Sequence, residues 1–265
     1  MIHLHNINMV FYPGTVLEKK ALKNISLTIE KGEFITVIGG NGAGKSTLLR
    51  VITGDLFPTR GKILINNQDV TTTPPEKRAR FVSQVFQDPR AGACPNLTIE
   101  ENMALAVMRG KKRGLRMALT PFHRQKFQEA LASVKLGLEG RLGTPLGMLS
   151  GGQRQAISLL MSVLGPSEIL VLDEHTAALD PKTSSSILKL TEQLIAEKKL
   201  TVLMVTHSMH QALLMGSRTL MLNEGKIVLD FQGNERKKLN EEELLKIFKQ
   251  KINEEHTGDE FILNN

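Results

Sequence analysis

The sequence predicts an α/β fold that a helical lobe interrupts, and three observations predict it. A glycine-rich loop, Gly39 to Thr47, joins a strand-like run to a helix-like run. Between residues 88 and 164 the apolar pattern is helical, and alternating strands and helices resume after it. The chain has 265 residues of which 41% are apolar, so it can bury the core of one large domain with an inserted lobe.

Each element follows from its own local pattern. Short apolar runs bounded by turn residues predict strands, and apolar residues at helical spacing predict helices. Acidic residues followed by lysines favour the last helix. In chain order we expect strands at Ile25–Ile29 and Glu33–Ile38 with a turn between them, a helix at Lys45–Thr53 that stops at Gly54, a hairpin at Gly61–Val70 turning at Asn66 and Asn67, helices at Ile99–Arg109 and Arg124–Leu136, strands at Glu168–Leu172 and Thr201–Thr206, a hairpin at Arg218–Val228 turning at Asn223–Gly225, and a helix at Glu241–Ile252 capped by Asn240.

Charge and cysteine content narrow the function classes without choosing one. The formal net charge of +7 suits anionic partners, whether nucleotide, nucleic acid or anionic membrane. The single cysteine, Cys94, excludes an internal disulfide framework and fits a reducing compartment. The first residues lack a basic segment followed by an apolar run, so we expect no signal peptide. No stretch approaches the roughly 20 apolar residues that span a bilayer, so work at a membrane would need another chain to supply the span.

The glycine loop is predicted to bind phosphate. Gly39, Gly44, Lys45 and Ser46 match the pattern G-x-x-x-x-G-K-[ST] between a strand and a helix. Its glycines let backbone N–H groups face a phosphate, and the helix start adds its positive dipole end. Lys45 would reach the β- and γ-phosphates, and the hydroxyl of Ser46 would ligate Mg²⁺. The nucleotide-binding residues expected here are Gly39, Gly40, Asn41, Gly42, Ala43, Gly44, Lys45, Ser46 and Thr47.

An acid pair ends the strand-like run EILVLDE. Asp173 could hold Mg²⁺ through its water shell, and Glu174 could act as general base on an attacking water. Taken alone, the pair would more simply be two surface acids after a buried strand. Together with the glycine loop, it predicts the second half of an ATPase site.

The stretch LSGGQRQ, Leu149 to Gln155, is typical of one protein family. Ser150 and two glycines at a helix start make a second anion-binding cap, or else a helix cap with no ligand. With the glycine loop and the acid pair in this order, the chain resembles the ATP-binding subunits of ABC transporters over nearly all of residues 1–230. The resemblance implies a P-loop NTPase core at about 1–87 and 165–253, with an antiparallel β subdomain, a helical subdomain at about 88–164, and a flexible tail at 254–265.

The resemblance also assigns roles by position. Ser150, Gly151, Gly152 and Gln153 would close over ATP held by another copy of the chain. The other implied residues are Gln87 on Mg²⁺ or the attacking water, Asp180 (in Ala178-Leu179-Asp180) crossing the dimer interface, His207 on the γ-phosphate, and either Phe11, favoured by family spacing, or Tyr12 stacked on adenine. The implied catalytic residues are thus Glu174, His207 and Gln87, and the implied metal ligands are Ser46, Gln87 and Asp173.

The implied function is ATP hydrolysis coupled to transport, with ATP and Mg²⁺ as cofactors. Expected partners are a second copy in an ATP-sandwich homodimer, transmembrane permease subunits and an extracytoplasmic substrate-binding protein, with no nucleic acid. The expected location is peripheral, at the cytoplasmic face of the cell membrane. Phrases such as FQDPRAGACPNLTIEEN favour import of a small solute, with amino acids one class. Alternatives are a soluble ABC ATPase acting on nucleic acid or the ribosome, an exporter, or a lipoprotein-release ATPase.

Two features depart from the expected pattern. His175 follows the acid pair, where it is either neutral packing or a group that tunes the base beside it. A basic stretch at residues 109–126 is either a solvated face or an attraction for anionic lipid or an acidic partner loop.

Overall fold

The computed structural model describes residues 1–111 and 119–251, and their contacts divide the chain into two compact units. Unit 1 comprises Met1–Val51, Leu56–Thr71 and the chain from Leu203 onward; unit 2 comprises Ile52–Asp55 and Thr72–Val202. The subdomain boundaries expected from the sequence remain a prediction, and the tail at 254–265 lies outside the described residues. Within the described residues, no helix is both long and apolar enough to cross a bilayer.

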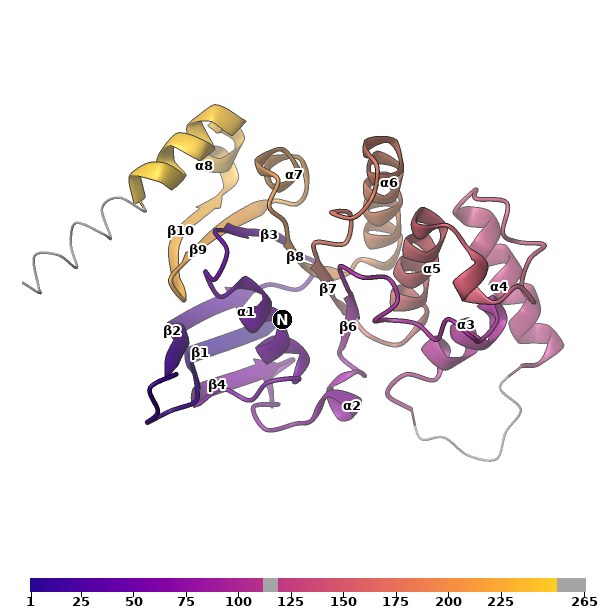
Figure 1. The fold of residues 1–265 in the computed structure, drawn as a ribbon, viewed down its shortest axis with the longest axis horizontal. Coiled ribbons are helices and arrows are strands. Elements are labelled where there is room, and N and C mark those ends of the chain that lie inside the picture. The colour runs from indigo at the N-terminus through magenta and orange to yellow at the C-terminus, as the bar shows by residue number, and fades with distance from the viewer. Residues whose placement is uncertain (112–118, 252–265) are drawn as a thin grey trace, which may run out of the picture. The chain divides into compact units, whose positions relative to one another are not determined.

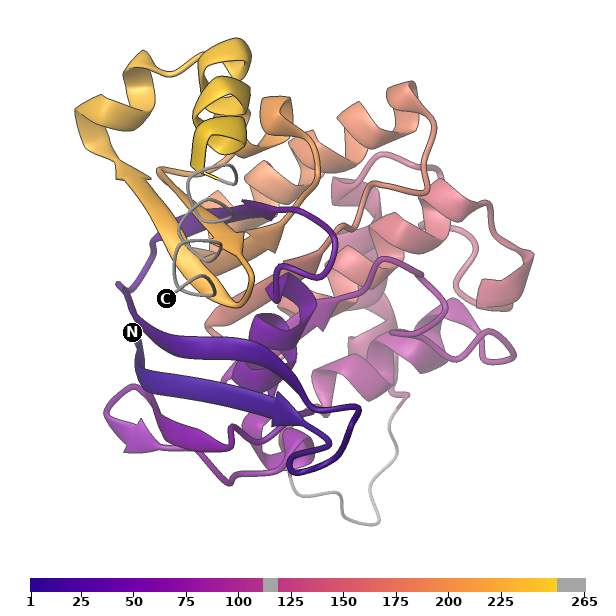
Figure 2. The ribbon, with the colours of Figure 1, turned by 60° about the vertical axis from the view of Figure 1, so that its left-hand side comes forward.

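Unit 1 holds a four-stranded antiparallel sheet in the order β2-β1-β4-β5. In β1, Leu4 pairs with Leu27 of β2 on one side and with Ile63 of β4 on the other. Those three side chains are buried, which places the core on one face of the sheet. Figure 2 shows β1 and β2 side by side. The strands are β1 (Ile2–Phe11), β2 (Lys19–Ile29), β4 (Arg60–Ile65) and β5 (Gln68–Asp69).

Unit 1 also contains the strands β10-β9-β3-β8, in that order. They are β3 (Phe34–Gly39), β8 (Thr201–Val205, which begins in unit 2), β9 (Arg218–Asn223) and β10 (Lys226–Gln232). β3 and β9 run parallel, with Val37 opposite Leu220. The helices of this unit are α1 (Lys45–Thr53, whose last two residues belong to unit 2), α7 (Met209–Leu214), α8 (Gly233–Lys238) and a helix at residues 241–251.

Unit 2 contains the neighbouring strands β7 and β6 and the longest helices. β6 (Val82–Val85) and β7 (Ile169–Asp173) are parallel. Helix α5 lies between α6 on one side and the pair α3 and α4 on the other (Figure 1). The helices are α2 (Pro75–Arg78), α3 (Ile99–Val107), α4 (Pro121–Ser133), the 3-10 turn η1 (Leu146–Met148), α5 (Gly151–Leu164) and α6 (Pro181–Lys198).

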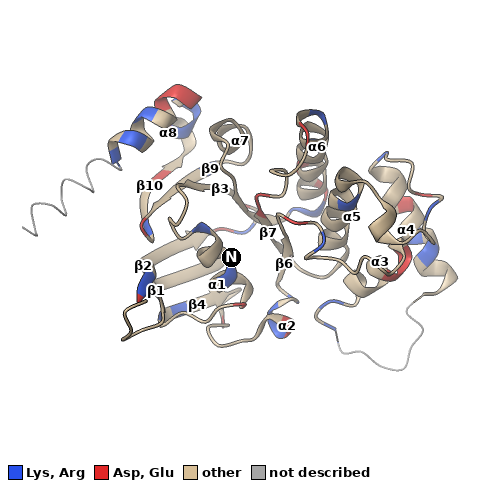
Figure 3. Cartoon of the chain, in the orientation of Figure 1, with Lys and Arg blue, Asp and Glu red and all other residues tan. Residues whose placement is uncertain are grey.

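Most predicted elements are confirmed, with corrected bounds. The helix after the glycine loop begins and ends where it was expected, and the two predicted hairpins are β4–β5 and β9–β10. α4 begins three residues earlier than predicted, because Thr120 caps it by accepting from the N–H of His123. The last helix has the expected cap, since Asn240 accepts from the N–H of Glu243 at 2.9 Å. Its acids lie toward one end and its lysines toward the other (Figure 3).

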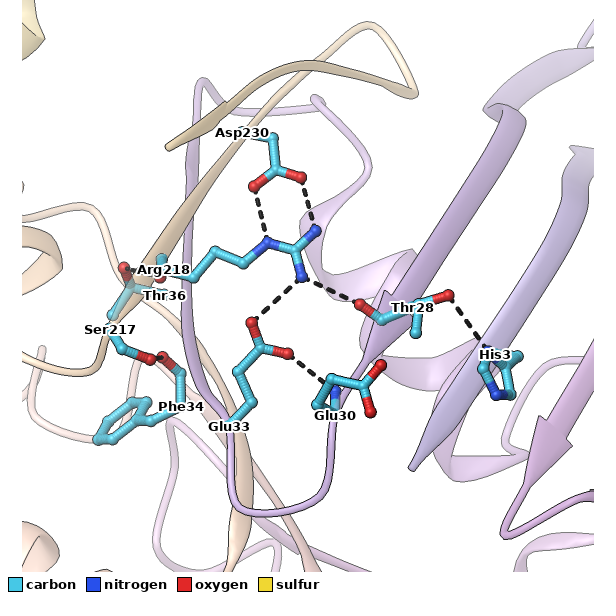
Figure 4. Close-up of polar contacts among 9 residues, drawn as sticks. All are labelled: His3, Thr28, Glu30, Glu33, Phe34, Thr36, Ser217, Arg218 and Asp230. Carbon is cyan, nitrogen blue, oxygen red and sulfur yellow. Dashed lines mark hydrogen bonds and ion pairs between the residues drawn. The ribbon is translucent and has the colours of Figure 1, made fainter. Parts of the chain in front are cut away.

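A half-buried cluster of hydrogen bonds around Arg218 joins both groups of strands in unit 1 (Figure 4). Its guanidinium forms two bonds to Asp230 of β10, at 2.7 and 2.6 Å. It also donates to Glu33 at 3.2 Å and to the carbonyl of Thr28 in β2 at 3.0 Å. The hydrogen bonds to Asp230 raise the pKa of Arg218 above its ordinary value, so the guanidinium stays charged.

Replacing Arg218 should therefore destabilise unit 1. We expect Arg218→Met to lower the free energy of unfolding by about 2 kcal/mol, less than for a fully buried ion pair because the carboxylate of Asp230 is 37% exposed. Urea unfolding measures the change. Lys226→Met removes a lysine from the exposed side of the same hairpin and should change stability by less than about 0.5 kcal/mol. Equal losses in both variants would contradict a specific role for the cluster.

Candidate functional site

The glycine loop connects the carboxyl end of β3 to α1 in unit 1. The hairpin turn between β9 and β10 supports it, because the N–H of Gly225 donates to the carbonyl of Ala43 at 2.9 Å. The same residue accepts from the N–H of Lys23 in β2 at 2.8 Å. The loop is thus held from both groups of strands. That backbone support keeps the start of α1 in a fixed position, where a helix end can face a bound anion.

Two of the glycines are required by close approach as well as by backbone conformation. Gly39 has φ 154°, and a Cβ atom there would collide with the carbonyl oxygen of Leu222. Gly44 has φ 103°, and a Cβ atom there would lie 2.6 Å from the carbonyl oxygen of Ala21. Any side chain at either position would push the loop off its support.

The charged and hydroxyl groups of the loop are suited to phosphate and Mg²⁺. The ammonium of Lys45 donates to the carbonyls of Gly39 and Gly40 at 2.8 and 2.9 Å, and this side chain is buried. These bonds fold the lysine back over the loop. Ser46 is exposed in the first turn of α1, with its hydroxyl accessible, and Thr47 is half-buried. The positive helix end, ammonium and hydroxyl form a donor set that fits a nucleoside phosphate with its metal.

The remaining expected residues of unit 1 lie at the ends of strands. His207 is exposed, between buried Thr206 at the end of β8 and Ser208, which caps α7. Phe11 is the last residue of β1 and is half-buried. Tyr12 follows it with φ 50° and is 65% exposed. Because the two residues are adjacent at the end of β1, the choice between them as the adenine platform stays a prediction.

In unit 2, the predicted acid pair lies at the carboxyl end of β7. Asp173 is the last residue of the strand, and both carboxylates are half-buried. Glu174 has φ 46°, a left-handed conformation that non-glycine residues seldom adopt. Its carbonyl accepts from the N–H of Ala177 at 2.9 Å, which closes a turn. Backbone of this kind is concentrated at functional sites, which agrees with the role expected of Glu174.

The LSGGQ stretch begins a helix, as predicted. Ser150 caps α5 by accepting from the N–H of Gln153 at 3.3 Å, and the side chain of Gln153 accepts from the N–H of Ser150 at 3.2 Å. This reciprocal capping box satisfies two of the helix-end donors. Gly151 and Gly152 are the first two residues of α5. The exposed start of this 14-residue helix can present N–H groups and a positive dipole to an anion.

A cavity of about 410 Å³ brings several predicted residues of unit 2 together. Gln87, exposed two residues after β6, lines it with Gly151 and with Ala178 and Leu179 of the loop before α6. Asp180 ends that loop and caps α6. Hydrogen bonds from the side chain and N–H of Thr183 hold the pKa of Asp180 below its ordinary value, so it is a carboxylate.

His175 is buried and neutral. Its Nε2 lies 3.1 Å from the hydroxyl of Thr191 in α6, and that hydroxyl donates its one proton to the carbonyl of Ile187. The imidazole is therefore the donor, which places its proton on Nε2. Burial lowers the pKa of His175 to about 4. Of the two sequence-based alternatives, this geometry favours packing, because the ring ties the turn after β7 to α6.

Buried neutral His175 predicts an acid-sensitive stability. Between the pKa of about 4 in the fold and its ordinary value of 6.5, the unfolded chain binds more protons than the folded chain. Stability should therefore be complete above pH 6.5 and fall by about 2 kcal/mol from pH 7 to pH 5 on account of this group. Urea unfolding in EDTA measures it. His175→Gln keeps a donor toward Thr191 without titrating, so an equal pH dependence in that variant would contradict the assignment.

The described part of the basic stretch is not a uniform solvated face. Arg109 is largely buried, and this lowers its pKa. Arg124 pairs with Glu100 at 2.7 Å, and Lys126 lies over the ring of Phe122 at 4.4 Å. Lys112, Arg113 and Arg116 lie outside the described residues, so the proposed attraction for lipid or a partner loop stays a prediction.

Sequence reasoning missed the groups that support the site. Gly225 holds the glycine loop through a backbone hydrogen bond, and the carbonyl of Ala21 leaves no room for a side chain at Gly44. No local pattern connects either residue to the loop. The glycine in the predicted hairpin turn was the one available signal. β1 was missed as well, because its histidines and asparagines interrupt the apolar alternation.

Comparison with known proteins agrees with this geometry. Residues 22–177 match the family model described as ABC transporter. A tyrosine transport ATP-binding protein from Clostridioides difficile is 42% identical over 94% of this chain and 98% of its own length. The thiamine import ATP-binding protein ThiQ of Yersinia pseudotuberculosis is 39% identical over 77% of this chain and 81% of its own. The dimeric ATP-binding cassette MJ0796, bound to ADP and Pi, superposes with a TM-score of 0.75 at 30% identity, covering 88% of this chain and 98% of that one. The chain therefore belongs to the ABC transporter family, as a subunit that binds ATP and hydrolyses it for transport.

Proposed function

We propose that two copies of this chain enclose two molecules of MgATP and drive import of a small solute, an amino acid, through a separate permease. The observation that carries the substrate class is the identity of 42% with a tyrosine transport ATP-binding protein over 94% of the chain. The direction is supported by the relative that is named a thiamine import ATP-binding protein. The thiamine import relative matches a smaller share, which makes an amino acid the first substrate to test.

The two-copy arrangement is supported by the exposed start of α5. Ser150 and Gly151 present a second anion-binding helix end in a chain that already has one at α1. A second copy would bring its own α5 to the nucleotide on the glycine loop of the first. The structurally similar cassette MJ0796 is dimeric, which supports this arrangement.

The chemical roles follow from the groups in place. Mg²⁺ would be held by Ser46, Gln87 and Asp173, all oxygen ligands of the kind it prefers. Glu174 would take a proton from the attacking water, and His207 would contact the γ-phosphate. The nucleotide phosphates would rest on the glycine loop and Lys45, with Phe11 or Tyr12 on the adenine.

We place the protein peripherally, at the cytoplasmic face of the cell membrane, with permease subunits and an extracytoplasmic substrate-binding protein as partners and no nucleic acid. The test is a pull-down of the tagged chain from detergent-solubilised native membranes, with partners identified by mass spectrometry. A multi-span permease with a binding protein supports the proposal, and that binding protein is then titrated with tyrosine, other amino acids and thiamine. Ribosomal proteins without a membrane partner would refute it, and thiamine binding alone would correct the substrate.

A further inference from the structure

The starts of α5 and α6 meet in unit 2 at one close contact. A Cβ atom at Gly152 would collide with the methyl carbon Cγ2 of Thr183, and would lie 3.7 Å from its Cβ and 3.8 Å from its Oγ1. Gly151, one residue earlier, would meet only Leu179 at 3.9 Å, an ordinary van der Waals distance. The two glycines of the LSGGQ stretch thus differ. The chain leaves room for a side chain at Gly151 and none at Gly152.

Backbone conformation does not explain the glycine at 152. Its φ lies outside the left-handed range, since Gly152 is absent from the positive-φ glycines of the described chain. In a helix, alanine is favoured over glycine. The contact with Thr183 is therefore the reason, within this chain, for having no side chain here.

Thr183 is held in the orientation that makes this contact. Its N–H donates to Asp180 at 3.0 Å, which holds the residue in place at the start of α6. A β-branched side chain in a helix has restricted freedom at χ1. The methyl group is left facing Gly152.

We propose that Thr183 is a positioning residue. Its methyl group packs against Gly152 and so fixes the spacing between α5 and the loop that ends at Asp180. This inference rests on the proposed ATP-sandwich dimer. In that dimer Ser150 meets the nucleotide of the other copy while Asp180 crosses the interface, so both surfaces must engage together. Thr183 contacts both elements, through its methyl group on one side and its backbone N–H on the other.

The experiment measures ATP-dependent dimerisation by analytical ultracentrifugation, with Glu174→Gln as the parent so that hydrolysis does not dissolve the dimer. We expect Gly152→Ala to weaken dimerisation by about 10-fold or more, because overpacking shifts α5 from α6. Adding Thr183→Ser removes the obstructing methyl and keeps the hydroxyl and N–H for Asp180. The double change should restore dimerisation to within about 3-fold of the parent.

Two matched controls separate spacing from general loosening. Thr183→Val keeps the methyl group that faces Gly152 and should not rescue Gly152→Ala. Thr183→Ser should not rescue Gly151→Ala, because position 151 has room in the chain and any loss there comes from the nucleotide. Binding of a fluorescent ATP analogue to the monomer should be unchanged throughout, since the glycine loop is untouched.

Unweakened dimerisation of Gly152→Ala would overturn the proposal, as would failure of Thr183→Ser to rescue it. A parent that stays monomeric in MgATP would refute the sandwich dimer itself. The spacing contact is then judged by thermal unfolding: a lower Tm in Gly152→Ala that Thr183→Ser restores supports it, and a Tm that Thr183→Ser does not restore overturns it.

Discussion

Glu174→Gln should lower the ATP hydrolysis rate about 100-fold or more and should make an ATP-bound dimer accumulate. Glutamine has the size of glutamate but lacks a carboxylate that can take a proton from water, and general-base catalysis supplies about 10²- to 10⁴-fold. Nucleotide binding should survive, because the glycine loop and the start of α5 at Ser150 are unchanged. Glu174 has a left-handed backbone, and its carbonyl accepts the hydrogen bond from Ala177 that closes the turn. Because this bond does not involve the side chain, the turn should keep its shape in the variant.

Phosphate release under single-turnover conditions measures the hydrolysis rate, and light scattering with size-exclusion chromatography measures the dimer in MgATP. Glu192→Gln is the matched control, since it makes the same change at an exposed position of α6. It should hydrolyse at the parent rate and give no trapped dimer. A Glu174→Gln protein that hydrolyses like the parent and stays monomeric would show that another group activates the water.

The candidate site could be predicted to the extent that its parts are local. The glycine loop, the acid pair and the LSGGQ stretch each combine a short residue pattern with a strand end or a helix start. The structure places α1 at Lys45, the end of β7 at Asp173 and the cap of α5 at Ser150, as their patterns require. Strand ends and helix caps depend on neighbours within a few residues, so one sequence suffices to find them.

What the sequence did not reveal depends on contacts between distant residues. Gly225 supports the glycine loop across about 180 positions, and Thr183 meets Gly152 from the next helix. The sequence leaves two roles open for His175, packing or tuning of the base beside it, and the contact with Thr191 in α6 favours packing. Such partners leave no periodic signal, because a single well-placed atom is enough to make each contact.

Lys45→Met should lower the affinity for MgATP by about 10- to 100-fold and should leave the chain folded. Lys45 is 6% exposed, and its ammonium is hydrogen bonded to the carbonyls of Gly39 and Gly40, so the loop holds the charge in place. A charge-assisted bond to phosphate contributes about 1.5–3 kcal/mol, which corresponds to a loss of affinity of about 10- to 100-fold. Methionine keeps the buried apolar stem and removes only the charge and its donors.

Isothermal titration with MgATP measures the loss, and thermal unfolding shows whether the fold survives. Losing two hydrogen bonds within the loop should cost about 1–2 kcal/mol of stability, too little to unfold a domain of this size. Lys20→Met removes the same charge from an exposed position of β2 and should leave affinity within about 2-fold, which excludes a general effect of net charge. Equal losses in the two variants would mean that ATP is drawn by the basic surface as a whole. A loss confined to Lys45 means that the loop recognises phosphate through one fixed charge, as its hydrogen bonds to Gly39 and Gly40 require.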